Sequence, residues 1–221
     1  MIGVEKTWPI YLSLQTTMAY PNGPSGPTLN TEKAESIAKS WLLEHPVQGP
    51  SLIVGPGGPH EITALVDVLP PPLSVLTAHA PEREIIERAI VHVGDMHATP
   101  FPAKSFECVF SSNVLEHALS PYVALLECRR ILRDGGIAYF IMPSFDGHQG
   151  GVGDFHLFCL DERVWRELLR KTGFELLDTE RQDGLPPQED SYYIHYRCRA
   201  VAPPAPHDRV LAEVEAAWNR E

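Results

Sequence analysis

The sequence predicts an α/β fold: a seven-stranded, mostly parallel sheet with helices on both faces and an antiparallel hairpin at its C-terminal end. Three observations support this prediction. Short apolar segments alternate with segments of helical spacing, which is typical of a parallel sheet. The segment "IAYFIM" (137–142) is apolar throughout, as expected of a strand buried on both faces. The last two apolar segments have no helix between them, so we expect them to pair antiparallel.

The first half of the predicted domain consists of two helices and three strands. Apolar residues recur at helical spacing ahead of the first strand, at Ala34, Ile37, Ala38, Trp41 and Leu42. The strand 51–55 then runs into a turn of glycine and proline. Pro59 suits the first turn of the following helix, because its missing N–H would have no partner there. Two more strands are predicted at 73–77 and 89–93.

The second half contains four strands and two helices. A strand at 106–111 is followed by a helix at 122–132, and "DGG" (134–136) is predicted to turn the chain into the strand 137–142. A helix at 161–173 is expected to close at Gly173, ahead of the strands 174–180 and 191–201. In the last strand we expect one packed face and one solvent face, the latter with Tyr193, His195, Arg197 and Arg199.

These elements predict one domain over residues 30–201. Residues 1–29 contain a run dense in proline and glycine and are expected to form an N-terminal arm or loop. Residues 202–221 are expected to form a linker and an amphipathic C-terminal helix.

The composition limits the binding partners and the cellular compartment that we expect for this protein. The net charge of −11 opposes binding to nucleic acid, and the basic residues of "CRRILR" (128–133) are expected on the solvated side of a helix. The four cysteines form no CxxC pair, which indicates reduced thiols rather than a disulfide frame or a zinc site. An export signal and a membrane-spanning run are both absent from the sequence pattern. We therefore expect a cytoplasmic protein without a membrane partner.

The candidate binding residues follow the predicted strands. In open α/β sheets, ligands bind beyond the carboxyl ends of the strands. The turn after the first strand, "GPGGPH" (55–60), brings backbone close to a ligand but lacks the third glycine of the dinucleotide fingerprint GxGxxG, whose place is taken by His60. The phosphate loop GxxxxGK[ST] is also absent. Glycines alone therefore do not identify the ligand.

A longer pattern resembles a known family. The segments "VGDMHATPFPAKSFECVFSSNVLEH" (93–117) and "LLECRRILRDGG" (125–136) resemble class I S-adenosylmethionine-dependent methyltransferases, in particular the small-molecule, methyltransferase type 11-like branch. The later "HLFCLDERVWRELLRKTGFELLDTE" (156–180) is similar to the closing segment of that branch. The resemblance extends over about residues 32–200. It implies a Rossmann-like sheet, S-adenosyl-L-methionine as cofactor, and methyl transfer.

The resemblance also implies roles for individual residues. The turn Gly55, Pro56 and Gly57 would face the methionine part of the cofactor. Asp95 would accept from the adenine amino group, with Met96 against the ring. The floor beneath the sulfonium would be Ser111 and Asn113.

Three positions depart from the family pattern. Ile53 stands where an acid is common inside the first strand, Pro59 replaces the third glycine, and Ala78 or His79 replaces the ribose-binding acid. A neutral His79 imidazole would still bond to a ribose hydroxyl. Losing one charge-assisted bond costs about 1.5–3 kcal/mol, so cofactor binding is expected to be weaker or altered.

The candidate bases are histidines. An imidazole titrates near neutrality and is able to take a proton from a hydroxyl acceptor. The two candidates are His117 and His156; each has a structural role as its alternative. The loop "DGHQGGVGDFH" (146–156) carries Asp146, His148, Asp154 and His156, and we interpret it as a lid rather than a metal site.

Two functions remain as hypotheses. The first is methyl transfer to a hydroxyl or amine of a small molecule, such as a natural product or sugar. The second is a catalytically inactive, methyltransferase-like binding or assembly module, suggested by the missing acids at positions 53 and 78–79. A nucleic-acid methyltransferase is disfavoured, because "FSSNVLEH" (110–117) stands where that group has [DN]PP[YFW]. The oligomeric state is left open between a monomer and a homodimer.

Overall fold

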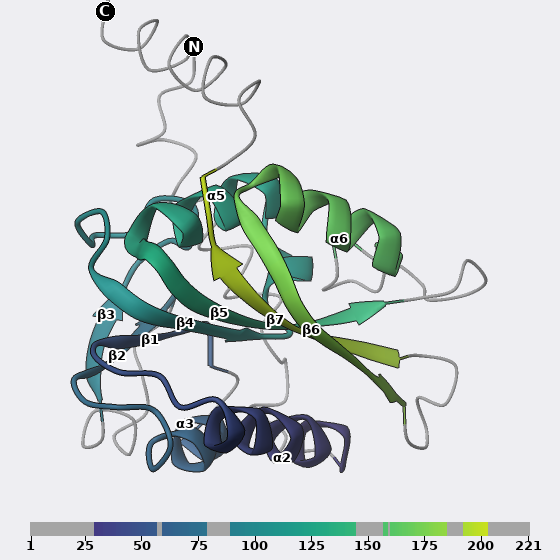
Figure 1. The fold of residues 1–221 in the computed structure, drawn as a ribbon, viewed down its shortest axis with the longest axis horizontal. Helices are drawn as coiled ribbons and strands as arrows, with labels where there is room; N and C mark the ends of the chain where they lie inside the picture. The colour runs from purple at the N-terminus through teal and green to yellow at the C-terminus, as the bar shows by residue number, and fades with distance from the viewer. Residues whose placement is uncertain are drawn as a thin grey trace, which may run out of the picture.

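The computed structural model describes residues 29–56, 59–78, 89–144, 157–158, 160–184 and 192–202. Its centre is a seven-stranded sheet of order β3-β2-β1-β4-β5-β7-β6 (Figure 1). The strands are β1 (Ser51–Val54), β2 (Leu73–Thr77), β3 (Ile90–Val93), β4 (Phe106–Ser112), β5 (Leu132–Ser144), β6 (Phe174–Asp183) and β7 (Tyr192–Ala200). The predicted arm (1–29) and C-terminal helix (202–221) lie almost wholly outside the described residues, so the predicted domain boundaries stay predictions.

The strand pairing changes from parallel to antiparallel across the sheet. Strands β1 to β5 pair in parallel, with β1 between β2 and β4. The last strand, β7, runs antiparallel to both β5 and β6 and separates them. The fold class predicted from the sequence is confirmed, including the antiparallel hairpin at the end.

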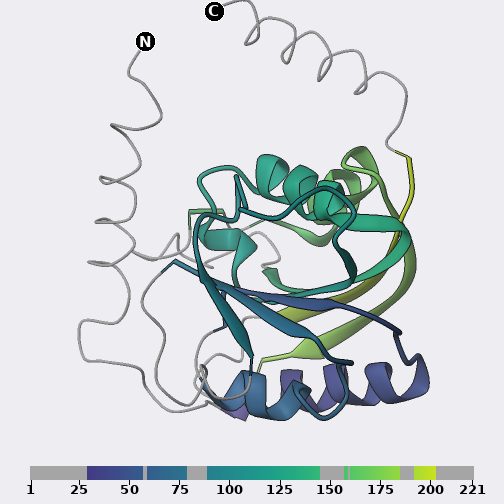
Figure 2. The same cartoon turned by 90° about the vertical axis from the view of Figure 1, so that its left-hand side faces the viewer.

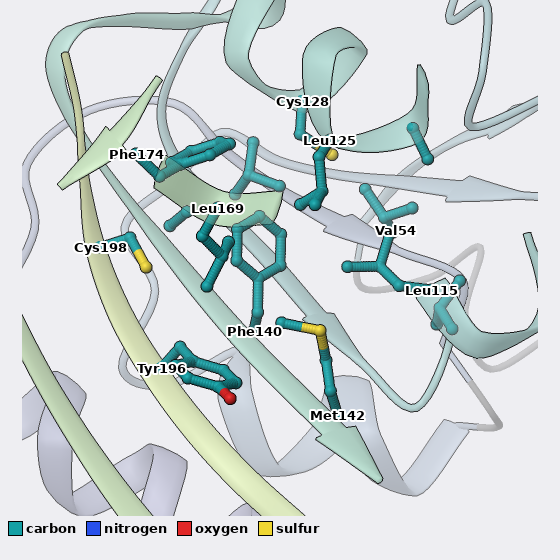
Figure 3. Packing of buried hydrophobic residues seen from close by; sticks show 14 of the residues in the cluster. Val54, Leu115, Leu125, Cys128, Phe140, Met142, Leu169, Phe174, Tyr196 and Cys198 are labelled. Carbon is teal, nitrogen blue, oxygen red and sulfur yellow. The ribbon is translucent and has the colours of Figure 1, made fainter. Parts of the chain in front are cut away.

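Helices cover both faces of the sheet (Figures 1 and 2). One face carries α2 (Leu29–Glu44) and α3 (Pro59–Leu65); the other carries α5 (Pro121–Ile131) and α6 (Glu162–Lys171). Alternate strand residues face each layer: Ile53 packs in the α2/α3 core, whereas Leu52 and Val54 pack in the α5/α6 core. Figure 3 shows the α5/α6 core, with Val54 and Leu115 at one end and Phe174 at the other. Two dry layers therefore fix the strand ends that carry the candidate site.

The predicted turn at "DGG" is wrong. Strand β5 already begins at Leu132, and its pairing with β4 is irregular: Leu132 lies opposite Phe106, and Ile137 lies opposite Cys108. The extra residues form a bulge, in which Gly135 has a φ of +80°. Glycine adopts such a conformation without strain, so it bends the strand here without ending it.

The predicted solvent face of the last strand is also wrong at His195, which is 2% exposed. Its ring meets Trp41 of α2 with centroids 6.1 Å apart, and Nε2 lies 2.9 Å from Oε1 of Gln182. Burial, with a smaller contribution from the charge of Lys33, lowers the pKa of His195 to about 4. A polar residue in an alternating strand is thus covered because α2 crosses this end of the sheet.

Three of the four cysteines, Cys108, Cys128 and Cys198, are buried free thiols, and Cys159 lies outside the described residues. Among the helices that the structure describes, none combines the length and apolar character needed to cross a membrane.

Candidate functional site

The turn after β1 is pressed against the loop after β4. These strands lie at the point where the order of the sheet reverses. Gly55 has a φ of +65°, and its N–H donates to the carbonyl of Leu76 over 2.8 Å. A Cβ at this position would lie 2.8 Å from both Cγ atoms of Val114. Glycine is required here by the backbone conformation and by the close contact together. Pro56 follows in the described turn, whereas Gly57 lies outside the described residues.

The loop after β4 holds polar atoms that lack partners. The Oγ of Ser111 and the Oδ1 of Asn113 are buried, and neither has a hydrogen-bond partner in the part of the chain that the structure describes. Asn113 adopts a φ of +52°, and its N–H donates to the carbonyl of Ile141, which fixes the backbone of the loop. Burying a polar atom without a partner costs free energy. Such atoms at the sheet reversal are expected of a site that a ligand completes.

A carboxyl group that the sequence prediction missed lies three residues further on. Glu116, in the short 3-10 helix η1 (Leu115–His117), is fully buried, and apart from its own backbone N–H its carboxyl oxygens have no hydrogen-bond partner among the described residues. Burial raises the pKa of Glu116 to about 8. Its backbone carbonyl accepts the N–H groups of Leu157 and Phe158 over 2.8 and 3.0 Å. The segment after the predicted lid loop is therefore hydrogen-bonded to the backbone of η1.

The predicted base His117 lies beside this acid. Its Nε2 is 3.8 Å from Oε1 of Glu116, and its side chain is 30% exposed, against 1% for the acid. This distance is too long for a hydrogen bond, but the two groups would attract each other strongly if both were charged. The arrangement presents an accessible imidazole with a buried carboxyl behind it. The second predicted base, His156, lies outside the described residues.

The loop after β3 is held by a continuous chain of hydrogen bonds. The Oδ1 of Asp95 accepts from the backbone N–H of His97 over 2.8 Å and contacts its Nδ1 at 2.6 Å. On the other side of the ring, Nε2 accepts the N–H of Ser120 over 3.2 Å. Ser120 is the N-cap of α5. The predicted adenine acceptor is thereby connected to a helix of the scaffold.

A second anchor holds the same loop. The Oε1 of Glu127 accepts from both the N–H and the Oγ1 of Thr99, over 2.8 and 2.7 Å. Arg130 binds both carboxyl oxygens of Glu127 over 2.6 Å and donates to the carbonyl of Phe101. Burial would raise the pKa of Glu127, but the bonds from Arg130 and Thr99 outweigh it and hold the pKa below its ordinary value. Arg130 is exposed, as expected of "CRRILR", and it also forms an ion pair with Glu127.

The remaining predicted residues are placed as follows. Met96 is partly buried and packs against the α5/α6 core. Ile53, which stands where the family has an acid, is fully buried in the α2/α3 core and offers no polar group. His79 lies outside the described residues. The structure thus brings the ends of β1 and β4 together, with the anchored loop after β3 on the other side of β2.

Comparison with known proteins agrees with this architecture. A family model described as a methyltransferase domain (Methyltransf_11) matches residues 55–140. A probable S-adenosylmethionine-dependent methyltransferase of Mycolicibacterium smegmatis is 30% identical over 96 residues, which are 42% of this chain and 37% of that protein. The chain covers less than half of the length of the curated relatives it matches.

Two solved structures share the fold. The first is the 1,6-didemethyltoxoflavin-N1-methyltransferase of Burkholderia thailandensis with bound 1,6-didemethyltoxoflavin and S-adenosylhomocysteine, at a TM-score of 0.69 and 16% identity, covering 91% of this chain and 92% of that one. The second is the [4+2]-cyclase SpnF, at a TM-score of 0.64 and 16% identity, covering 89% and 94%. The predicted resemblance to class I S-adenosylmethionine-dependent methyltransferases is confirmed, in sequence over residues 55–140 and in the fold of the described chain.

Proposed function

We propose that this protein is an S-adenosylmethionine-dependent methyltransferase that acts on a small molecule. The observation that carries the proposal is the group of buried, unpartnered polar atoms of Ser111, Asn113 and Glu116. They lie where the strand order reverses, next to the turn at Gly55. Such a group costs stability in the free protein and is expected where a polar ligand supplies the missing partners.

The residues at these strand ends fit the cofactor. The backbone at Gly55 and Pro56 would hold its amino-acid end, beside the Val114 side chain that packs against Gly55. Asp95 would accept from the adenine amino group, and Met96 would pack against the ring. The polar atoms of Ser111 and Asn113 would lie beneath the sulfonium. When bound, S-adenosylmethionine supplies an electrophilic methyl group, so the protein mainly orients donor and acceptor.

The pair of His117 and Glu116 in η1 offers a candidate base on the acceptor side of the site. His117 is accessible and would take the proton of an acceptor O–H or N–H as the methyl group is transferred. The carboxyl of Glu116, 3.8 Å away, is neutral near pH 7 because burial raises its pKa to about 8, so it would stabilise the imidazolium that forms only after losing its own proton. His156, His79 and Gly57 keep the roles predicted for them from the sequence.

The proposed acceptor is a hydroxyl or amine of a small molecule, such as a natural product or sugar. The Burkholderia neighbour is named as an N-methyltransferase with a small bound substrate, which supports this class. The net charge of −11 disfavours nucleic acid. The buried free thiols agree with a cytoplasmic location, which we also propose. A homodimer and a monomer are both compatible with the proposal.

Calorimetry with S-adenosylmethionine and S-adenosylhomocysteine tests the proposal. We expect both ligands to bind, and Asp95→Ala to weaken binding about tenfold or more through the loss of one charge-assisted bond. Asp134→Ala is the matched control, because Asp134 is an exposed loop aspartate paired with Lys104 and Arg129. Absence of both heat and thermal shift at millimolar ligand would contradict the proposal.

A measurement of methyl transfer distinguishes the hypothesis of an inactive binding module from that of an enzyme. Labelled S-adenosylmethionine offered with panels of hydroxyl and amine acceptors should yield a labelled product with wild type, and Asp95→Ala should abolish it without unfolding the protein. Cofactor binding without any methyl transfer would favour the module.

A further inference from the structure

Asp95 is bonded at one of its two carboxylate oxygens. Both described partners of its carboxylate, the N–H and the Nδ1 of His97, contact the same oxygen, Oδ1. The side chain is 16% exposed. One carboxylate oxygen is thus fixed by the protein, and within the described part of the chain Oδ2 accepts no hydrogen bond.

The backbone of Ser120 decides the tautomer of His97. A backbone N–H only donates, so the Nε2 that it contacts must carry the lone pair. The proton of the neutral ring then resides on Nδ1 and is donated to Asp95. The ring is only 12% exposed, and the helix that positions Ser120 is packed in the α5/α6 core. The position of α5 therefore fixes the orientation of the imidazole, and the imidazole fixes the orientation of the Asp95 carboxylate.

We propose that His97 is a positioning residue that aims Oδ2 of Asp95 at the exocyclic amino group of adenine and so makes the site selective for adenine over hypoxanthine nucleosides. A carboxylate oxygen accepts from the amino group at C6 of adenine, but it repels the carbonyl oxygen at C6 of hypoxanthine. This selectivity depends on a fixed carboxylate, because a rotating one would turn its oxygen away from the ring. The inference rests on the proposed function.

The test compares S-adenosylhomocysteine with its deaminated analogue S-inosylhomocysteine by calorimetry. We expect wild type to bind the adenosyl ligand at least about tenfold more tightly, the value of one charge-assisted hydrogen bond. Asp95→Asn should bring the two affinities close together, because an amide is able to turn its N–H toward the hypoxanthine carbonyl. His97→Ala should lower the ratio at least threefold, in the same direction.

Two conservative variants separate the two bonds of the ring. In His97→Asn the side-chain amide takes the place of Nδ1 and should retain most of the selectivity, because it still donates to Asp95. In His97→Gln the amide takes the place of Nε2, keeps the contact to Ser120 and should lose the selectivity as His97→Ala does. These variants also guard against a failure of His97→Ala to fold.

Thr99→Val is the matched structural control. It removes the two hydrogen bonds that the Thr99 hydroxyl makes with α5, one donated to Glu127 and one accepted from Arg130, but touches neither Asp95 nor His97. It should lower the melting temperature and leave the affinity ratio unchanged.

The outcomes distinguish this inference from the proposed function. An unchanged ratio in both His97→Ala and His97→Gln, or a wild type that binds both nucleosides equally, would overturn the role of His97 while cofactor binding stands. A wild type that binds neither ligand would overturn both. An equal fall of the ratio in Thr99→Val would mean that loop anchoring in general, and not His97, sets the selectivity.

Discussion

The loops that follow β3 and β4 contrast sharply. After β3, the side chains of Asp95, His97 and Thr99 are bonded to one another or to α5. After β4, polar atoms of Ser111, Asn113 and Glu116 are buried without partners.

The loop after β3 is held in one geometry by its hydrogen bonds, whereas the loop after β4 lacks the partners that a ligand would supply. A satisfied network in a low-dielectric interior holds one geometry before any ligand arrives. Unsatisfied groups destabilise the free protein, and their loss should therefore be cheap or even favourable unless a ligand is present. Stability measurements on the two loops should give effects of opposite sign, and the predictions below test this.

The largest expected effect concerns Glu116, in the incomplete loop. Its folded-state pKa of about 8 lies above its ordinary value of 4.5. Between these values the folded protein holds one more proton than the unfolded chain, so stability falls as the pH rises, by roughly 1 kcal/mol per pH unit. Urea denaturation at pH 5, 6, 7 and 8 measures this slope. Glu116→Gln should remove this contribution, whereas those of Glu35, whose pKa burial raises to about 7, and of His195 remain.

The control for Glu116 is Glu44→Gln, which changes an exposed acid at the end of α2 and should keep the slope of wild type. The other described titratable groups that interact with Glu116 are His117 and Tyr193, and both remain in every variant. A slope that is identical in wild type and Glu116→Gln would mean that this carboxyl is ionised in the folded protein.

The next effect concerns Glu127 of α5, which anchors the loop after β3. Glu127→Ala removes the acceptor of Thr99 and leaves Arg130 without its carboxylate, which should cost about 2–3 kcal/mol in the free energy of unfolding. The control is Glu167→Ala, because Glu167 and Arg170 form the same i, i+3 pair on an exposed helix face. Its denaturation midpoint should stay near that of wild type. Equal effects of the two substitutions would contradict the claim that the bonds of Glu127 hold the loop after β3 in place.

The third effect lies at the contact between the β1 turn and the β4 loop. Gly55→Ala combines a left-handed backbone with a Cβ 2.8 Å from Val114, and should cost about 2 kcal/mol. Gly135→Ala, which also has a positive φ but no atom within 4 Å of the added Cβ, should cost about half as much. Adding Val114→Ala to Gly55→Ala should recover part of the loss. Additive effects in this double variant would mean that the contact is unimportant.

Much of the fold could be predicted because it depends on local patterns. Apolar runs and glycine or proline turns located all seven strands, and the strand ends placed Gly55, Asp95, Ser111 and Asn113 on the edge where ligands bind. The errors arose where tertiary contacts decide. The bulge at Gly135 and the cover of α2 over His195 involve partners far away in the chain.

The same reason limited the prediction of the site. Sequence spacing marked His117 as a base, but the buried carboxyl of the preceding residue became evident only from its lack of partners. Within η1, Glu116 stands directly after Val114 and Leu115, so its burial could have been suspected from its neighbours. The role of His97 could not, because Ser120 lies 23 residues further along the chain.

The position of β7 between β5 and β6 has a consequence for biosynthesis. Strand β6 leaves the ribosome before β7, but it has no place in the sheet until β7 has docked along β5. Until then the open edge of β5, whose residues from Ala138 to Ser144 are all buried in the finished protein, offers unpaired backbone groups to other chains. A nascent chain that stalls before Tyr192 therefore exposes the edge of a strand that is largely buried in the finished protein, and a chaperone that shields this edge would act in that interval.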